Sequence, residues 1–223
     1  MQRASTGLID AWIGGGVPDR RMHRLPDLLR GLLAGDGLAG ESLPLTSDVR
    51  RGIDTLLPTF ERVCGELAAI PDALDHGDMH GGNVLVRDDE HRLVDWGDAQ
   101  ITHPFATLLI TYQVDFVYRR KDGHPLPDTL DRVAASRRMR DAYLEPWTDV
   151  ASAHELRAMF ANAIWVNHVC RAIDYAKLFA GLKPNEIPQW LGEIADLLTD
   201  WYERQTLLGS DEMIDAVWRG PTR

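Results

Sequence analysis

The feature that most constrains the fold is one polar, glycine-rich segment in a chain whose other stretches have a helical pattern. Residues 74–86, LDHGDMHGGNVLV, combine two histidines, an asparagine, three glycines and aspartate with a following run of β-branched residues. Two residues suffice to turn a hairpin, and glycine or asparagine can supply the turn without ionisable neighbours. The segment therefore indicates a chemical site carried on a turn and a short hairpin.

Apolar residues recur at helical spacing on both sides of this segment. The second helical stretch begins at Ser47, a residue type that commonly caps a helix N-terminus. Residues 83–87 and 91–96, joined by a turn-rich DDE, have the pattern of a short β-hairpin. We therefore predict an α+β fold that is mostly helical with a small β-hairpin at its catalytic edge. The predicted helical stretches cover residues 19–35, 47–70, 104–120, 127–144, 151–182 and 187–205.

Composition limits the classes of function. The chain has 223 residues, of which 44% are hydrophobic, as expected for an ordinary globular protein. A net charge of −10 and the lack of a basic stripe argue against nucleic-acid binding and suit a cationic ligand. Cys64 and Cys170 have no CxxC spacing, and no apolar run approaches the length of a membrane span. We expect a cytoplasmic protein without a membrane or nucleic-acid partner, in which both cysteines are buried.

Three oxygen-bearing side chains are predicted to converge at the hairpin. Asp78 and Asn83 follow the spacing D-x-x-x-x-N, and Asp95 lies twelve residues beyond Asn83 on the returning strand. Two carboxylates at close range repel by about 4 kcal/mol at an effective dielectric of ~20, so a cation or a shared proton is needed. Carboxylate and amide oxygens favour Mg²⁺. A turn capped by Asp and Asn would explain the glycines but not Asp95.

These residues resemble the catalytic segment of the aminoglycoside phosphotransferase and choline kinase family, which has a protein kinase-like fold. HGDMHGGN, residues 76–83, is similar to the family loop H-G-D-x-H-x-x-N, and VDWGDA resembles its I-D-W/F metal segment, here residues 95–98. The resemblance implies a phosphotransferase that uses ATP and Mg²⁺ and transfers the γ-phosphate to a hydroxyl of a small molecule. Nothing in the sequence separates an aminoglycoside or amino alcohol from a sugar or macrolide acceptor.

The same resemblance implies a role for each polar residue of the segment. Asp78 would accept the proton of the substrate hydroxyl, and Asn83 and Asp95 would hold Mg²⁺. His76 would brace the loop. His80 stands where protein kinases carry a lysine and is a candidate phosphate contact.

Two departures from the family pattern affect the prediction. Thr107 stands where many members have an acidic residue, which removes a usual loop-bracing carboxylate. The 75 residues before His76 contain no lysine and have a helical pattern, whereas the family places a β-rich nucleotide-binding lobe there. We therefore expect residues 1–20 to be an N-terminal segment or linker and residues 21–223 to be a kinase-like C-terminal lobe without its N-terminal lobe. Such a chain should fold, self-associate through its exposed surface, and lack kinase activity by itself.

Two alternatives belong to other functional classes. The first is a non-catalytic kinase-like module that binds a small molecule, and the second is a metallohydrolase that uses His76, Asp78 and His80 as ligands.

Helical spacing also predicts core faces, which comprise Met159, Ala163, Val166, Cys170 and Ile173 in one helix and Trp190, Ile194, Leu197 and Trp201 in the next. The candidate pocket residues on the first of these helices are Trp165, His168, Arg171, Asp174 and Tyr175.

Overall fold

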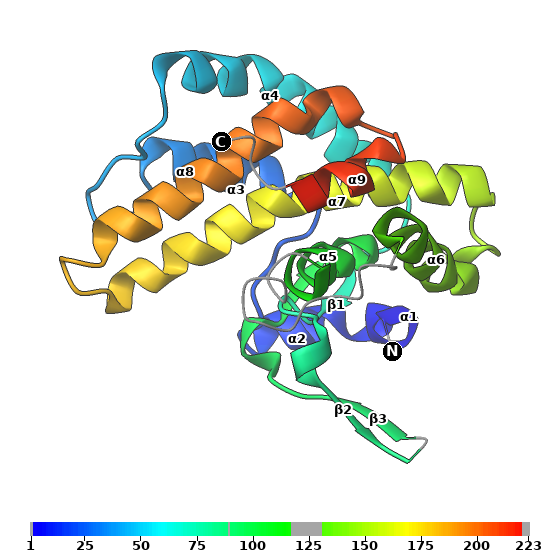
Figure 1. Ribbon diagram of the computed structural model, residues 1–223. Coiled ribbons are helices and arrows are strands. Elements are labelled where there is room, and N and C mark those ends of the chain that lie inside the picture. Colours follow the sequence, from blue (N-terminus) through cyan, green and yellow to red (C-terminus); the bar gives the residue numbers. More distant parts are fainter. Residues whose placement is uncertain (1, 89, 117–130, 220–223) are drawn as a thin grey trace.

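The computed structural model describes residues 2–88, 90–116 and 131–219, and most of these are helical (Figure 1). The predicted mostly helical α+β fold with a small hairpin is confirmed. Residues 117–120 and 127–130 of the predicted helical stretches lie outside the described residues. The α-helices are α1 (Gln2–Ser5), α2 (Ile9–Gly14), α3 (Leu25–Ala34), α4 (Ser47–Leu67), α5 (Leu108–Phe116), α6 (Arg132–Leu144), α7 (Ala153–Leu178), α8 (Ile187–Glu203) and α9 (Glu212–Arg219).

Helix α7 runs through the centre of the molecule, with α8 beside it and α5 and α6 on the other side (Figure 1). It begins with a capping box in which Ser152 and Glu155 satisfy each other's backbone N–H groups. Residues 163–170 are all buried, so every side of this part of the helix is covered by protein. A helix that is buried all round is typical of the centre of a helical domain.

Three aromatic rings join the central helices. Phe60 of α4 meets Trp165 of α7 and Trp201 of α8 edge-on, with ring centroids 5.8 and 5.3 Å away. The two tryptophans stack at 5.0 Å, and the Trp165 indole donates a hydrogen bond to the Trp201 carbonyl at 2.7 Å. Such rings contribute packing beyond their buried area. Trp165 is therefore a core residue, and its prediction as a pocket residue is wrong.

The predicted core faces are largely correct. Ala163, Val166, Cys170, Ile173, Ile194 and Trp201 are buried, and Met159, Trp190 and Leu197 pack partly buried against the same core. Cys64 is buried as well, and both cysteines are free. His168, a predicted pocket residue, is fully buried, because it lies on a helix with no open side at that level.

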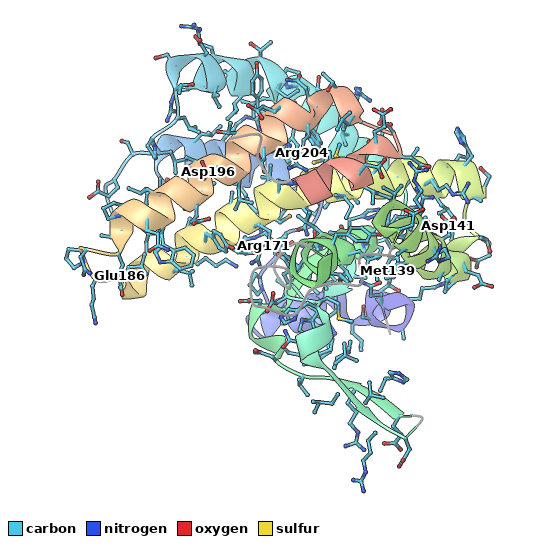
Figure 2. All side chains as sticks on the ribbon, in the orientation of Figure 1. Met139, Asp141, Arg171, Glu186, Asp196 and Arg204 are labelled. Carbon is cyan, nitrogen blue, oxygen red and sulfur yellow. The ribbon has the colours of Figure 1, made fainter. Side chains whose placement is uncertain are left out.

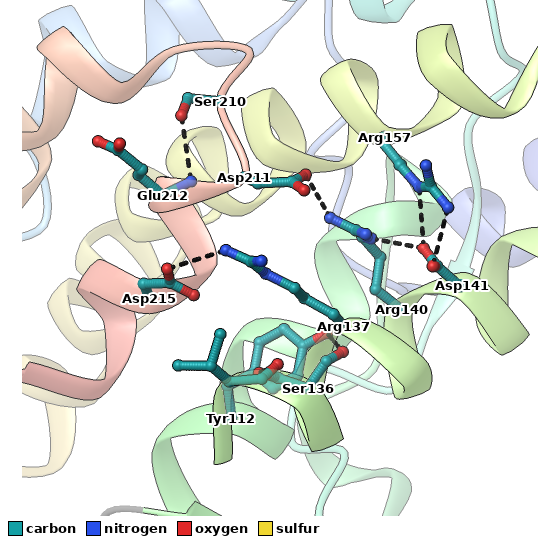
Figure 3. Close-up of polar contacts among 11 residues, drawn as sticks. Tyr112, Ser136, Arg137, Arg140, Asp141, Arg157, Ser210, Asp211, Glu212 and Asp215 are labelled. Atoms are coloured by element: carbon teal, nitrogen blue, oxygen red, sulfur yellow. Dashed lines mark hydrogen bonds and ion pairs between the residues drawn. The ribbon is translucent and has the colours of Figure 1, made fainter. Parts of the chain in front are cut away.

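Ion pairs attach the C-terminal helix α9 and the turn before it to α6 (Figure 3). The nearly buried Arg140 side chain contacts Asp141 at 2.8 Å and also pairs with Asp211. Asp141 also accepts from Arg157 of α7 at 2.9 Å. A buried guanidinium with two carboxylate partners is compensated for its desolvation, so this cluster holds α6, α7 and the α9 turn together.

The structure contains two antiparallel sheets of two strands each. Strands β2 (Val84–Arg87) and β3 (Glu90–Leu93) form the predicted hairpin, which projects from the helical body (Figure 1). Strands β1 (Ala73–Asp75) and β4 (Gln100–Thr102) form a second sheet that the sequence analysis missed. This second sheet pairs the chain just before the HGDMHGGN loop with the chain just after the VDWGDA segment.

Residues 2–20, expected to be an N-terminal segment or linker, pack against the second sheet through two short helices. The Ser5 hydroxyl of α1 accepts a hydrogen bond from the Leu74 N–H at 3.0 Å. The Arg20 N–H donates to the Ile101 carbonyl at 2.8 Å beside a parallel bridge from Asp19. The N-terminal segment thus extends the β1–β4 surface. Among the described residues, no helix has both the length and the apolar character needed to cross a bilayer.

We predict that stability decreases on acidification because of two buried histidines. Burial lowers the pKa of both His103 and His168 to about 3, whereas an unfolded imidazole titrates near 6.5. As the pH falls below about 6.5, the unfolded chain takes up protons that the fold excludes. Each histidine should then remove up to about 1.4 kcal/mol of unfolding free energy per pH unit. Asp75 acts in the opposite sense. Because burial raises the pKa of its carboxyl, its contribution to the unfolding free energy is present at low pH and is lost as the pH rises.

Urea unfolding of His168→Gln between pH 6.5 and 5 measures this effect. The variant should show a shallower loss of unfolding free energy with pH than the unchanged chain. His154→Gln, at an exposed position of the same helix, is the matched control and should keep the original slope. Equal slopes for all three proteins would contradict the prediction.

Candidate active site

His76 connects the loop to the end of the hairpin. Its ring is buried, with Nε2 2.8 Å from the Val94 carbonyl and Nδ1 accepting from the Asp78 N–H at 3.4 Å. Because Nδ1 accepts, the proton lies on Nε2, which donates to Val94. The ring also packs against Trp96 at 4.7 Å between centroids. These are the contacts of a loop-bracing residue, and the contribution of His76 to activity stays a prediction.

Gly77 brings the loop into direct contact with the VDWGDA segment. Its φ of +77° lies in the left-handed region, which glycine adopts at little cost. A Cβ at this position would collide with the backbone carbonyl of Asp98. Glycine is therefore required here both for its backbone conformation and for space.

Asp78 is held from two sides. The Asn83 side-chain amide donates to the Asp78 carbonyl at 2.9 Å and to its carboxylate Oδ2 at 3.3 Å. His80 Nε2 lies 3.5 Å from the same Oδ2, and His80 Nδ1 accepts from the Gly82 N–H at 3.0 Å. The Asp78 side chain remains 30% exposed, so a substrate can reach it.

The hairpin places the backbone of Asp95 close to that of Asn83, and the convergence of the Asp78, Asn83 and Asp95 side chains stays a prediction. The hairpin pairs Val84 with Leu93, and the Val94 N–H donates to the Asn83 carbonyl at 3.1 Å, which places Asp95 directly after a residue bonded to Asn83. Asp95 has φ +61° and ψ +63°, an uncommon conformation for a residue that is not glycine. Its side chain is exposed and has no hydrogen-bond or ion-pair partner among the described residues.

This donor set fits a magnesium ion shared with substrate phosphates. Asn83 uses its amide nitrogen toward Asp78, which leaves the Oδ1 oxygen for a cation. Asp95 adds an unpaired carboxylate, and Mg²⁺ commonly takes one or two protein carboxylates with water and phosphate oxygens. In the described part of the chain, no group of three or more His, Cys, Asp or Glu side chains could form an all-protein metal site.

The contacts of His76 argue against the metallohydrolase alternative. Both of its ring nitrogens are engaged by backbone groups, so neither lone pair is available to a metal. His80 likewise uses Nδ1 for the Gly82 N–H. The three residues His76, Asp78 and His80 therefore do not form a ligand set in this arrangement.

A buried carboxyl beneath the loop was missed by the sequence analysis. Thr107, which replaces the acidic residue of the family pattern, donates its hydroxyl hydrogen bond to Asp75 of β1. Gln100 of β4 donates to the other Asp75 oxygen at 3.3 Å. Burial raises the pKa of Asp75, and these hydrogen bonds oppose the shift. The bracing carboxyl thus lies on β1, directly before His76, and Thr107 is its partner.

Helix α7 reaches the loop through Arg171. The guanidinium donates to the Gly77 carbonyl at 3.1 Å, and Asp174 and Tyr175 lie partly exposed on the next turn. Of the candidates from the sequence, Arg171 therefore contacts the loop and Tyr175 contacts Arg171, in contrast to the buried Trp165 and His168.

The loop and the metal segment define a member of a known class of enzymes. The family model APH, described as the phosphotransferase enzyme family, matches residues 18–146, which is more than half of the chain and includes the loop and metal segment. The chain belongs to the phosphotransferase enzyme family, and the resemblance predicted from its catalytic segment is confirmed. Comparison with curated proteins and with solved structures gave no match.

We predict that Gly77→Ala is strongly destabilising. Alanine at φ +77° costs about 1–2 kcal/mol, and its methyl group must also displace the Asp98 backbone. The unfolding free energy should fall by more than about 2 kcal/mol in a urea titration. Gly65→Ala on α4, where a Cβ meets no atom within 4 Å, should be neutral or stabilising by up to about 1 kcal/mol. Similar stabilities of the two variants would contradict the proposed close contact.

Proposed function

We propose that this protein is an ATP- and Mg²⁺-dependent phosphotransferase whose acceptor is a hydroxyl of a small molecule. The observation that carries the proposal is the pairing of Asp78 with Asn83 directly beside the hairpin end that bears Asp95. Membership in the phosphotransferase enzyme family supports the same reaction class.

In this proposal Asp78 is the general base. The acceptor hydroxyl gives its proton to the Asp78 carboxylate as its oxygen bonds to the γ-phosphorus and the bond to the ADP oxygen breaks. The Asn83 amide donates one hydrogen bond to the Asp78 carboxylate and one to its backbone carbonyl, which reduces the reorganisation needed in the reaction. The partial exposure of Asp78 leaves its second oxygen open to the acceptor.

Asn83 and Asp95 would hold the magnesium ion, which would neutralise charge on the nucleotide phosphates. His80 carries its proton on Nε2 and can donate it to a phosphate oxygen, since Nδ1 is engaged by Gly82. His76 keeps the loop attached to Val94, so that Asp78 and Asp95 stay at a fixed separation.

We further propose that residues 21–223 form a kinase-like C-terminal lobe and that a nucleotide-binding lobe completes the site. The projecting hairpin leaves the apolar residues Leu85 and Val86 56% and 62% exposed. Leu8 and Trp12 of the N-terminal segment are exposed as well. Exposed apolar side chains of this size favour either a covering domain or self-association.

We predict distinct effects for the two aspartates of the site. Asp78→Asn removes the base and should lower kcat by about 10²–10⁴ while nucleotide affinity is retained. Asp95→Asn removes a metal ligand and should also weaken Mg-nucleotide binding. Both effects are measured in a protein that includes the nucleotide-binding lobe, by ADP release with a panel of hydroxyl acceptors and by nucleotide titration.

Asp88→Asn provides the matched control, because Asp88 lies in the hairpin turn and shares the positive φ of Asp95. It should leave kcat and nucleotide affinity unchanged. Turnover of Asp78→Asn within about threefold of the unchanged protein would contradict the assignment of the base. Nucleotide binding without transfer to any acceptor would instead favour a non-catalytic binding module.

A further inference from the structure

Arg171 is a cation placed directly against the catalytic loop. It lies on the side of α7 that faces the loop (Figure 2) and donates to the carbonyl of Gly77, the residue before Asp78, at 3.1 Å. Its second contact is with the Tyr175 hydroxyl at 3.4 Å, and the guanidinium stacks over the Tyr175 ring at 5.1 Å. Arg171 lies outside the residues that match the family.

Arg171 differs from the other largely buried arginines of the described chain in its partners. Arg20, Arg140 and Arg204 each pair with at least one carboxylate. Arg171 contacts a carbonyl and a phenol, and no carboxylate lies within ion-pair distance of it among the described residues. Buried arginines are commonly paired with a carboxylate. Arg171 lacks such a direct partner, and its guanidinium keeps donors that are not used within the described residues.

The guanidinium remains charged at this position. Burial opposes its charge, but Tyr175 and the more distant carboxylates of Asp174 and Asp78 keep the pKa of Arg171 above its ordinary value. A guanidinium presents five N–H donors in a planar fork that matches a carboxylate or phosphate. The two observed contacts leave several of these donors for a ligand.

Arg171 contacts the loop from the side of α7. We take this side to be the one from which the acceptor reaches Asp78. The β2–β3 hairpin, whose returning strand leads to Asp95, projects in the direction away from α7 (Figure 1). Tyr175 beside Arg171 meets Trp190 of α8 edge-on at 5.1 Å, so an aromatic surface adjoins the guanidinium. A substrate that offers its hydroxyl to Asp78 from the side of α7 would contact both the Arg171 guanidinium and the aromatic surface.

We propose that Arg171 binds a carboxylate or phosphate of the acceptor, so that the enzyme phosphorylates a hydroxyl of an anionic small molecule. This proposal rests on the proposed function and narrows its substrate class. It replaces the cationic acceptor suggested by the net charge of −10. Exposed charges farther apart than a Debye length of about 8 Å are largely screened, so groups close to Asp78, including Arg171, matter more for the acceptor than the net charge of the whole chain.

The test uses two series of polyols that differ only in one charged group. The first series is gluconate, sorbitol and glucamine, and the second is glycerate, glycerol and 3-amino-1,2-propanediol, with glycerol phosphate added as the phosphate counterpart. Binding is measured by isothermal titration and thermal shift without nucleotide. The proteins compared are the unchanged chain, Arg171→Gln, Arg171→Lys and Arg157→Gln, the last removing an exposed arginine of the same helix.

In the unchanged chain at least one anion should bind about tenfold or more tightly than its neutral and cationic partners, as expected for charge-assisted hydrogen bonds. Arg171→Gln should lose this preference, Arg171→Lys should keep part of it, and Arg157→Gln should keep all of it. A residue that merely supports the loop would change stability without changing charge preference. The proposal is overturned if no anion binds at millimolar concentration, if a cationic partner binds best, or if Arg171→Gln keeps the preference.

Phosphotransfer assays separate this proposal from the proposed function. Anion binding that depends on Arg171 in a protein that includes the nucleotide-binding lobe but has no transfer activity would contradict the phosphotransferase assignment and leave the anion site intact. Transfer that depends on Asp78 but shows the same acceptor KM in Arg171→Gln would contradict the anion site alone.

Discussion

Three parts of the chain meet at the backbone of Gly77. Its left-handed conformation lets the loop pass against the Asp98 carbonyl, and its own carbonyl accepts the Arg171 hydrogen bond from α7. His76 on one side is bonded to the hairpin end, and Asp78 on the other is bonded to Asn83. The relative positions of Asp78, the VDWGDA segment and the central helix therefore depend on one residue without a side chain.

Below this point the site is supported by the β1–β4 sheet and by the buried Asp75. Two short strands enclose the loop and the hairpin at their base, so the whole catalytic segment leaves and returns to the helical body at one place. The carboxyl of Asp75 receives donors from η4 (Pro104–Thr107) and from β4, and it thereby ties the start of the loop to the chain leading into α5. A family-level acidic position has changed to threonine here, while a carboxylate occupies the strand that faces it. The support for the loop is retained with the chemical partners exchanged between two elements.

Local pattern was sufficient to predict much of this arrangement and insufficient for the rest. The hairpin could be predicted because two apolar strands flank a turn, and this also placed Asp95 near Asn83. Strands β1 and β4 contain three residues each, too few to show alternation, and they pair across an intervening hairpin. The Asp75–Thr107 contact joins residues 32 positions apart, which no spacing rule reveals. Trp165 and His168 were misassigned because one apolar stripe was taken to mark the only buried face of α7, whereas α3, α4, α6, α8 and α9 all pack against it. Arg171 was among the candidates, but its lack of a carboxylate partner required coordinates.

The left-handed backbone of Asp95 has a consequence for how the site is made ready. A residue other than glycine in this region costs on the order of 1 kcal/mol or more, and the cost is met when the chain folds, before any ligand arrives. The Asp95 backbone is thus already in place next to the residue bonded to Asn83, and a cation would have little backbone left to order on binding. The left-handed conformation of Asp95, just after strand β3, lowers the stability of the folded chain by a small amount. Because this backbone is already ordered, ligand binding would not have to supply the free energy of ordering it.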